Sequence, residues 1–180
     1  MKNKLGMLIS LLFTLNSAQA LNAKDTTSVK AIDNFHINKY LGTWYEVARL
    51  PNYFEKKCNF PITATYDKSD DGKVSVTNSC QRDNGSTNTS IGKAIFAEEQ
   101  NIGKLKVTFA PSFLSWMKFA YGDYWVLATD YKHYSLVGDP SRQYLWILSR
   151  TPKLAPEYIL QLKATAKSMG YDLSDLISEQ

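Results

Sequence analysis

The residue types that most often do chemistry in proteins are few in this sequence and far apart. The two histidines, His36 and His133, are distant from each other, and the sequence has no nucleophile elbow, closely spaced acid pair or glycine-rich phosphate loop. Both histidines are interpreted as surface or capping residues. Two cysteines, Cys58 and Cys80, do not complete a zinc pattern with them. We therefore expect no catalytic residue, no metal site and no cofactor.

The first residues have the pattern of a secretory leader. Lys2 and Lys4 precede an apolar run over residues 5–15, and Ala18-Gln19-Ala20 supplies the small residues that a signal peptidase accepts. The run is too short to span a bilayer as a helix. We interpret residues 1–20 as a signal peptide, and expect a soluble mature chain that begins near Leu21.

Export determines how the two cysteines are interpreted. In an oxidising compartment, a single cysteine pair favours a disulfide between Cys58 and Cys80, and two free thiols are the alternative. The bridge would close a loop of about 22 residues, which the chain-entropy model values at roughly 3 kcal/mol.

Composition and charge indicate one domain and no nucleic-acid partner. The formal charge of +4 falls to +2 when Lys2 and Lys4 leave with the leader, and the basic residues are scattered, so no nucleic-acid partner is expected. Residues 21–34 are interpreted as a flexible N-terminal arm. Residues 35–180 are long enough for one well-packed domain. The aromatic content of 13% suits a protein that lines a cavity with rings.

Short strands separated by turn signals follow one another from Thr43 onward. The run Leu105, Val107 and Phe109 alternates with polar residues, as expected for a strand with one buried face. Short connections favour an up-and-down antiparallel order, and an eight-stranded barrel is wide enough to hold one small ligand. The expected strands are 44–50, 62–66, 73–78, 90–96, 105–109, 124–129, 134–137 and 144–149.

One helix is expected after the last strand. Pro156 suits a first helical turn, Leu162 and Ala166 belong to an apolar stripe at helical spacing, and Gly170 suits the C-terminal stop. The narrow stripe predicts packing against the outside of the sheet. The fold class is thus all-β: an eight-stranded up-and-down antiparallel β-barrel with one C-terminal α-helix outside.

Three blocks of sequence carry a family resemblance. They are Gly42-Thr43-Trp44-Tyr45-Glu46, Thr129-Asp130-Tyr131 and Trp146-Ile147-Leu148-Ser149-Arg150. Their order and spacing resemble the three signature regions of the lipocalins, from about Phe35 to the end of the helix. The amino-acid sequence of residues 124–131 and 139–148 is similar to that of bacterial lipocalins, plant temperature-induced lipocalins and apolipoprotein D.

The resemblance implies structural roles for the signature residues. Gly42 begins the first strand at the closed end, Trp44 fills the base of the barrel, and the Arg150 guanidinium lies across its indole, a contact worth about 0.5–2 kcal/mol. Thr129, Asp130 and Tyr131 would form the turn between strands six and seven, also at the closed end.

The resemblance also implies a function and a location. Members of this group bind fatty acids, lysophospholipids and other amphipathic lipids, and the bacterial ones are linked to envelope maintenance. Bacterial relatives often carry a lipid-modified cysteine directly after the leader, whereas the first cysteine here is Cys58. We therefore expect a periplasmic protein without that anchor, with outer-membrane association as the alternative.

Strand alternation predicts which side chains line the cavity. If Trp44 faces inward, Glu46 and Ala48 share its face, although one bulge would invert this assignment. Glu46 is interpreted as a structural carboxylate that is hydrogen-bonded at the barrel base, in preference to a ligand contact, and the facing of 124–129 and 134–137 is left open. Other expected lining residues are Ala64, Val74 and Leu105. The residues expected to bind ligand are Glu46, Tyr66, Val76, Val107, Phe109, Trp116, Tyr144 and Trp146.

Residues 51–61 and 110–122 are expected at the open mouth, together with both cysteines. The loop 111–121 is rich in apolar residues, among them Phe113, Trp116 and Phe119. A soluble protein seldom exposes such a surface without use. The loop is interpreted as a lid, a homodimer contact, a membrane-surface patch or a loop packed into the mouth.

Carriage of an amphipathic lipid is the preferred function. Its alternatives are a lipid-modifying enzyme on the same barrel, because a fold alone does not exclude catalysis, and an interaction module that uses the loop 111–121.

Overall fold

The computed structural model describes residues 28–69, 72–111, 113 and 117–179. The predicted signal peptide and residues 21–27 of the predicted arm lie outside these ranges. Nine strands and two α-helices are described, together with the 3-10 helix η2 (Lys118–Ala120). The strands are β1 (Gly42–Arg49), β2 (Asn59–Lys68), β3 (Val74–Gln81), β4 (Thr87–Phe96), β5 (Lys104–Thr108), β6 (Gly122–Thr129), β7 (Tyr134–Gly138), β8 (Leu145–Ser149) and β9 (Ile177–Ser178).

Eight strands close into a barrel in which each neighbour in sequence is a neighbour in space. The sheet order is β2-β3-β4-β5-β6-β7-β8-β1, and a further β1–β2 pairing closes it. All of these pairings are antiparallel. The up-and-down barrel expected from the sequence is confirmed.

One edge of β1 pairs with two different strands, one after the other along its length. Near the closed end Gly42 to Glu46 pair with Tyr66 to Ile62 of β2, whereas Ala48 and Arg49 pair with the short β9. The C-terminal strand therefore occupies the β1 edge where β2 has diverged. β9 was not predicted from the sequence, since two residues carry no periodic pattern.

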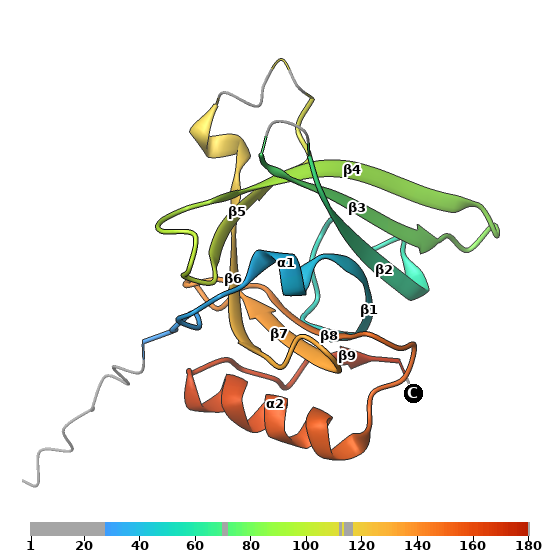
Figure 1. The fold of residues 1–180 in the computed structure, drawn as a ribbon. Helices are drawn as coiled ribbons and strands as arrows, with labels where there is room; N and C mark the ends of the chain where they lie inside the picture. Colours follow the sequence, from blue (N-terminus) through green and yellow to red (C-terminus); the bar gives the residue numbers. More distant parts are fainter. Residues whose placement is uncertain (1–27, 70–71, 112, 114–116, 180) are drawn as a thin grey trace, which may run out of the picture.

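The predicted helix is present as α2 (Pro156–Ser168) and packs outside the barrel, below β7 and β8 in Figure 1. Buried Leu162 and Ala166 join the cluster formed by outward-facing strand residues such as Leu136. Gly170 has a φ of +81°. The Gly170 N–H donates to Lys167 O, and the Tyr171 N–H donates to Ala166 O. These two hydrogen bonds form a Schellman motif, in which the residue with positive φ is usually glycine.

The first described segment covers the closed end of the barrel. The helix α1 (Ile37–Tyr40) lies inside the ring of strands in the view of Figure 1, and Phe35 and Tyr40 are buried there. Ile32 N donates to Val126 O at 2.9 Å, and Gly103 N donates to Ile32 O at 2.9 Å. Residues 28–34, which were predicted to belong to a flexible arm, therefore contain a segment that is hydrogen-bonded to the barrel. The composition of these residues does not reveal this contact, because its partners are far away in the sequence.

A bulge in β1 corrects one prediction about the cavity. The register against β8 shifts between Glu46 and Ala48, and both Val47 and Ala48 pack in the outer cluster with α2. Ala48 therefore faces outward, because the extra residue inverts the alternation beyond it. The faces of β6 and β7 also become known: Val126 and Val137 pack inside the barrel.

Within the described ranges, none of the helices has the length and apolar character needed to cross a bilayer.

Candidate functional site

A cavity of about 650 Å³ lies at the end of the barrel where β1 ends and β2 begins. Strand residues, the loop 53–58 and the segment 120–123 form its wall. Trp116, which was predicted to bind ligand, lies outside the described residues. The other residues with that prediction all line the cavity: Glu46, Tyr66, Val76, Val107, Phe109, Tyr144 and Trp146.

The closed end of the barrel lies beneath the cavity. Val74 and Leu105 were expected in the lining, but they pack in the core with Phe35 and Tyr40. The reason is their position: β3 and β5 both start at the closed end, so their first inward side chains fill the base of the barrel.

Three tyrosine hydroxyls form a chain at the floor. Tyr124 Oη lies 2.7 Å from Tyr66 Oη and 2.9 Å from Tyr40 Oη, and Tyr40 Oη lies 3.1 Å from Ser135 Oγ. Burial raises the pKa of Tyr40 to about 12 and that of Tyr66 and Tyr124 well above the usual range. The phenols stay neutral, and Tyr66 and Tyr124 give the apolar cavity a few polar atoms.

Buried charges gather in the cavity wall near the mouth. Arg49 Nη1 lies 2.7 Å from Glu46 Oε1, and Arg49 Nε lies 3.2 Å from Glu55 Oε2. Burial, then repulsion by Glu55, raises the pKa of Glu46 to about 8, although Arg49 opposes both effects. Glu46 is thus a carboxyl group bonded within the protein, but it lies in the cavity wall and not at the barrel base, where the sequence placed it.

The sequence analysis did not find the partners of Glu46. Strict alternation places Arg49 on the face opposite Glu46, and the β1 bulge brings the two together. Glu55 belongs to the mouth loop, where its N–H donates to Asn52 Oδ1 at 2.9 Å and its Oε2 accepts from Asn52 Nδ2 at 2.6 Å. No sequence motif marks either residue.

Aromatic rings lie beside this charged group. Phe54 lies 5.6 Å from Tyr144 and 6.2 Å from Trp146, and Tyr144 lies 5.9 Å from Trp146, all between ring centroids. We call these three rings the ring cluster. Trp146 Nε1 donates to Glu55 Oε2 at 3.4 Å, which places the indole next to the carboxylate. Phe54 was missed because it is one of several residues in a loop that was assigned to the mouth only as a whole.

Hydrophilic side chains line part of the wall formed by β3 and β4. Asn78 pairs with Ser90, and Cys80 pairs with Asn88, so these inward positions alternate with outward ones along both strands. Asn78 Oδ1 is buried and has no hydrogen-bond partner among the described residues. This side of the cavity therefore offers amide and hydroxyl groups to a ligand.

The predicted disulfide between Cys58 and Cys80 is confirmed, with a Cα–Cα distance of 5.4 Å. Both residues line the cavity. The bridge joins the loop that carries Phe54 and Glu55 to strand β3, and so fastens part of the mouth to the barrel wall.

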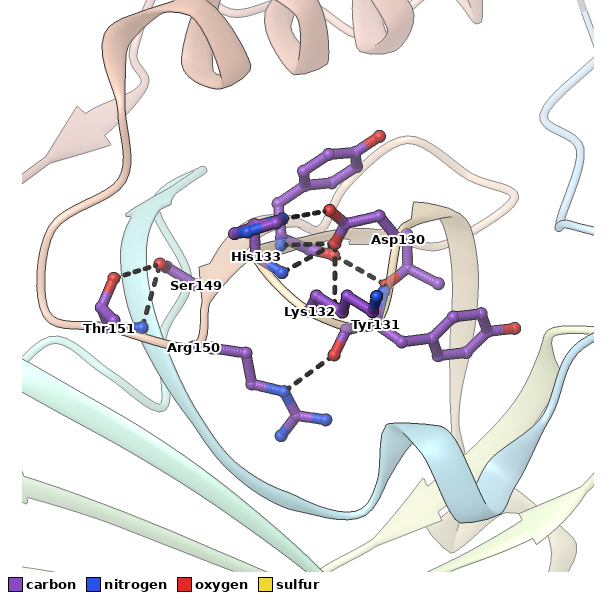
Figure 2. Close-up of polar contacts among 9 residues, drawn as sticks. Asp130, Tyr131, Lys132, His133, Ser149, Arg150 and Thr151 are labelled. Carbon is purple, nitrogen blue, oxygen red and sulfur yellow. Dashed lines mark hydrogen bonds and ion pairs between the residues drawn. The ribbon is translucent and has the colours of Figure 1, made fainter.

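The signature residues gather at the closed end, away from the cavity. The Arg150 guanidinium carbon lies 3.7 Å from the Trp44 ring centroid, so the predicted stacking is present, and the indole is fully buried. Arg150 Nη1 donates to Thr43 O, and Nε donates to Tyr131 O, as Figure 2 shows for the second bond. Gly42 has a φ of +91°, which favours glycine at the start of β1.

Asp130 organises the turn between β6 and β7. Its Oδ1 accepts the backbone N–H groups of Lys132, His133 and Tyr134, and the His133 ring lies 2.6 Å from Oδ2 (Figure 2). Partial burial acts to raise the pKa of Asp130, but these hydrogen bonds lower it overall. Thr129 Oγ1 also accepts the N–H of Tyr131. Asp130 is thus bonded within its own turn, and His133 and His36 lie outside the described cavity lining.

The described part of the chain contains no group of three histidine, cysteine or acidic residues arranged to hold a metal ion. The described cavity lining contains no histidine, and its two cysteines are joined to each other. What the arrangement can do is enclose an apolar molecule and contact a polar group at the mouth.

Comparisons with known proteins agree with this geometry. The model of a lipocalin-like domain matches residues 35–180. The outer membrane lipoprotein Blc of Escherichia coli K12 is 41% identical over 152 residues, which cover 83% of this chain and 81% of that protein. Temperature-induced lipocalin-1 of Arabidopsis thaliana is 40% identical over 152 residues, covering 82% and 80%.

The similarity extends to animal proteins and to solved structures. Apolipoprotein D of Rattus norvegicus is 35% identical over 176 residues, which cover 93% of this chain and 88% of that protein. The structure of insecticyanin from the tobacco hornworm Manduca sexta superposes with a TM-score of 0.67 at 27% identity, covering 84% of each chain.

Proposed function

The chain belongs to the lipocalin family, whose members bind small hydrophobic ligands, and we propose that it binds one fatty acid or lysophospholipid non-covalently in the barrel cavity. The acyl tail would lie in the barrel and the headgroup at the mouth. Lipocalins are mainly carriers, so we propose storage or transport of the lipid without chemical change.

The observation that carries the proposal is the distribution of polarity along the cavity. Ala64, Val76, Val107 and Leu148 supply apolar wall, whereas the ion-paired Glu55 lies in the mouth loop. A single-chain amphipathic lipid has the same distribution. Its tail gains about 0.8 kcal/mol for each buried CH₂ group, so affinity should increase with chain length until the cavity is filled.

Similarity and the predicted leader support a place in the bacterial envelope. The Escherichia coli relative is named an outer membrane lipoprotein, and residues 1–20 have the pattern of a signal peptide. We propose that the mature protein acts in the periplasm in envelope maintenance, with outer-membrane association as the alternative. Fractionation of cells that express the full chain would separate the two, because a periplasmic extract contains the protein only in the first case.

The exposed rings at the mouth favour a membrane-surface contact. Tyr53, Phe113 and Phe119 expose 72%, 71% and 82% of their surface, and aromatic side chains favour the boundary between lipid and water. Through them a lipid would enter the cavity directly from a bilayer. Flotation of wild type with vesicles, compared with Phe113→Ser/Phe119→Ser, tests this. Loss of dimers instead of vesicle binding in the variant would point to a homodimer contact.

Titration of delipidated protein with saturated fatty acids and lysophospholipids of increasing length, each below its micelle concentration, tests the proposed ligand. Trp146 in the lining should report binding by fluorescence. Ala64→Phe, which fills the deep cavity, should shorten the preferred chain, whereas Ile91→Ala on the exposed outer face should not. A response independent of chain length would contradict lipid carriage.

A further inference from the structure

The charged residues that line the cavity are all acids. Glu46, Glu55, Asp123 and Asp139 line it, and the described lining contains no lysine, arginine or histidine. Arg49 pairs with both glutamates and Lys106 pairs with Asp123 at 2.9 Å. Two bases thus contact three of the four acids, and Asp139 is bonded by the Ser141 and Tyr144 N–H groups instead. Even with the Glu46 carboxyl protonated, which its raised pKa favours at neutral pH, these four acids and two bases together keep a net negative charge.

The ring cluster offers the second part of a cation site. The planes of Phe54, Tyr144 and Trp146 lie within 33° of one another, so their faces point in similar directions. All three line the cavity. The negative face of an aromatic ring attracts a cation within about 6 Å, and tryptophan does so best.

A carboxylate stands directly beside these rings. Glu55 accepts the Trp146 indole N–H and, through Asn52 and Arg49, is held in one orientation by several bonds. A quaternary ammonium group has no N–H to donate, so it is held by ring faces and by nearby negative charge. The mouth supplies both within one side of the cavity.

We propose that the mouth selects lipids whose headgroup carries an ammonium cation, held against the ring cluster of Phe54, Tyr144 and Trp146 beside the Glu55 carboxylate. The inference rests on the proposed lipid carriage and specifies its ligand class. Between the two ligand types proposed above, it favours a lysophospholipid with a choline or ethanolamine headgroup over a fatty acid. A fatty-acid carboxylate at the same place would face an acidic wall, and the two bases that contact this wall, Arg49 and Lys106, already have carboxylate partners.

Three single-chain ligands with the same acyl length separate the headgroup from the tail. They are an alkyltrimethylammonium salt, a neutral monoacylglycerol and a fatty acid, each titrated at neutral pH below its micelle concentration. We expect the trimethylammonium ligand to bind about tenfold tighter than the neutral one, and the fatty acid to bind most weakly. A lysophospholipid with a choline headgroup should, like the trimethylammonium ligand, bind tighter than the neutral ligand.

The variants test where the cation is held. Phe54→Leu keeps an apolar side chain in an exposed loop but removes a ring face, and should reduce the trimethylammonium preference about threefold. Glu55→Gln keeps an amide oxygen for Asn52 and Trp146, and should reduce that preference further. The matched control is Phe109→Leu, which removes a ring that lines the same cavity outside the ring cluster; it should change the affinity for all three ligands alike, so that the ratio between the trimethylammonium and neutral ligands stays the same.

The outcomes distinguish this inference from the proposed function. Equal affinity for the three headgroups, with affinity still increasing along a chain-length series, would overturn the cation site and leave lipid carriage intact. No dependence on chain length would overturn lipid carriage itself. A preference that falls equally in Phe54→Leu and Phe109→Leu would overturn the placement at the ring cluster.

Discussion

The two ends of the barrel are built in opposite ways. At the closed end Trp44 is fully buried, its indole N–H donates to Tyr40 O, and Arg150 stacks on its ring while bonding four backbone carbonyl groups. At the open end the charged side chains lie beside a cavity and the rings are partly exposed. The closed end joins chain segments that are far apart in sequence, whereas the open end has a cavity with polar side chains that a ligand could contact.

The comparison shows that the residues most easily recognised in a sequence need not be those that act on a ligand. The signature residues Trp44, Asp130 and Arg150 lie at the closed end, where we expect them to stabilise the fold. Of the residues at the mouth, Glu46 and Trp146 lie at the ends of signature blocks, whereas Arg49, Phe54, Glu55 and Tyr144 lie in no short motif. The following changes test whether the two ends are independent, from the largest expected effect to the smallest.

Trp44→Ala should be the most damaging single change. Truncation leaves a cavity beneath Arg150 and Tyr40 and should lower the free energy of unfolding by roughly 3–5 kcal/mol. Urea unfolding gives the loss, and lipid titration of the folded fraction should show an unchanged preference for chain length. Unchanged stability with abolished binding would place ligand recognition at the closed end. That result would contradict the proposed division between a stabilising closed end and a ligand-binding open end.

Removal of the disulfide should affect the open end selectively. Cys58→Ser/Cys80→Ser should lower stability by roughly 2–4 kcal/mol, because the bridge restricts the unfolded chain. The loop with Phe54 and Glu55 would also lose its attachment to β3, so headgroup discrimination should weaken. Circular dichroism should still report an intact barrel. Headgroup discrimination equal to that of wild type would show that the loop is held without the bridge.

Glu46 should make stability depend on pH. Its pKa is about 8 in the folded chain against a usual value of 4.5, so the folded state binds more protons and stability falls as pH rises between them. Arg49 and Glu55 are the charged groups that face it. Between pH 5 and 7.5 the decrease should be about 2–3 kcal/mol.

The matching variant for this prediction is Glu46→Gln, which retains an oxygen for Arg49 but does not titrate. Its stability should change less over the same pH range in urea unfolding. Parallel profiles for wild type and variant would contradict the raised pKa and show that Arg49 keeps Glu46 ionised.

Arg150→Lys should have the smallest effect. An ammonium group keeps the charge but cannot stack flat on the Trp44 ring or bond several carbonyl groups at once, so a loss of about 1–2 kcal/mol is expected. Ligand affinity should stay as in wild type. A lower affinity at unchanged stability would show that the two ends are coupled.

Much of the architecture followed from local patterns in the sequence. Alternating residues such as Leu105 and Val107 identified strands, the apolar stripe with Leu162 identified α2, and the single cysteine pair identified the disulfide. The strands and the helix depend on residues close in sequence, and two cysteines allow only one intramolecular pairing. α1 and β9 were missed because four residues and two residues carry no periodicity.

The tertiary structure decided the facing of side chains and the composition of the mouth. The bulge between Glu46 and Ala48 turned Ala48 outward and brought Arg49 to Glu46, and the path of the loop brought Glu55 and Phe54 to Trp146. Repeated patterns in the sequence determined that a barrel forms, and the family resemblance placed Trp44 and Arg150 at its base, but neither identified Tyr40, Val74 and Leu105 as residues that also fill the base. The sequence did not determine which charges and rings meet at the mouth, because one extra residue in a strand reverses every side chain beyond it and a loop path depends on distant contacts.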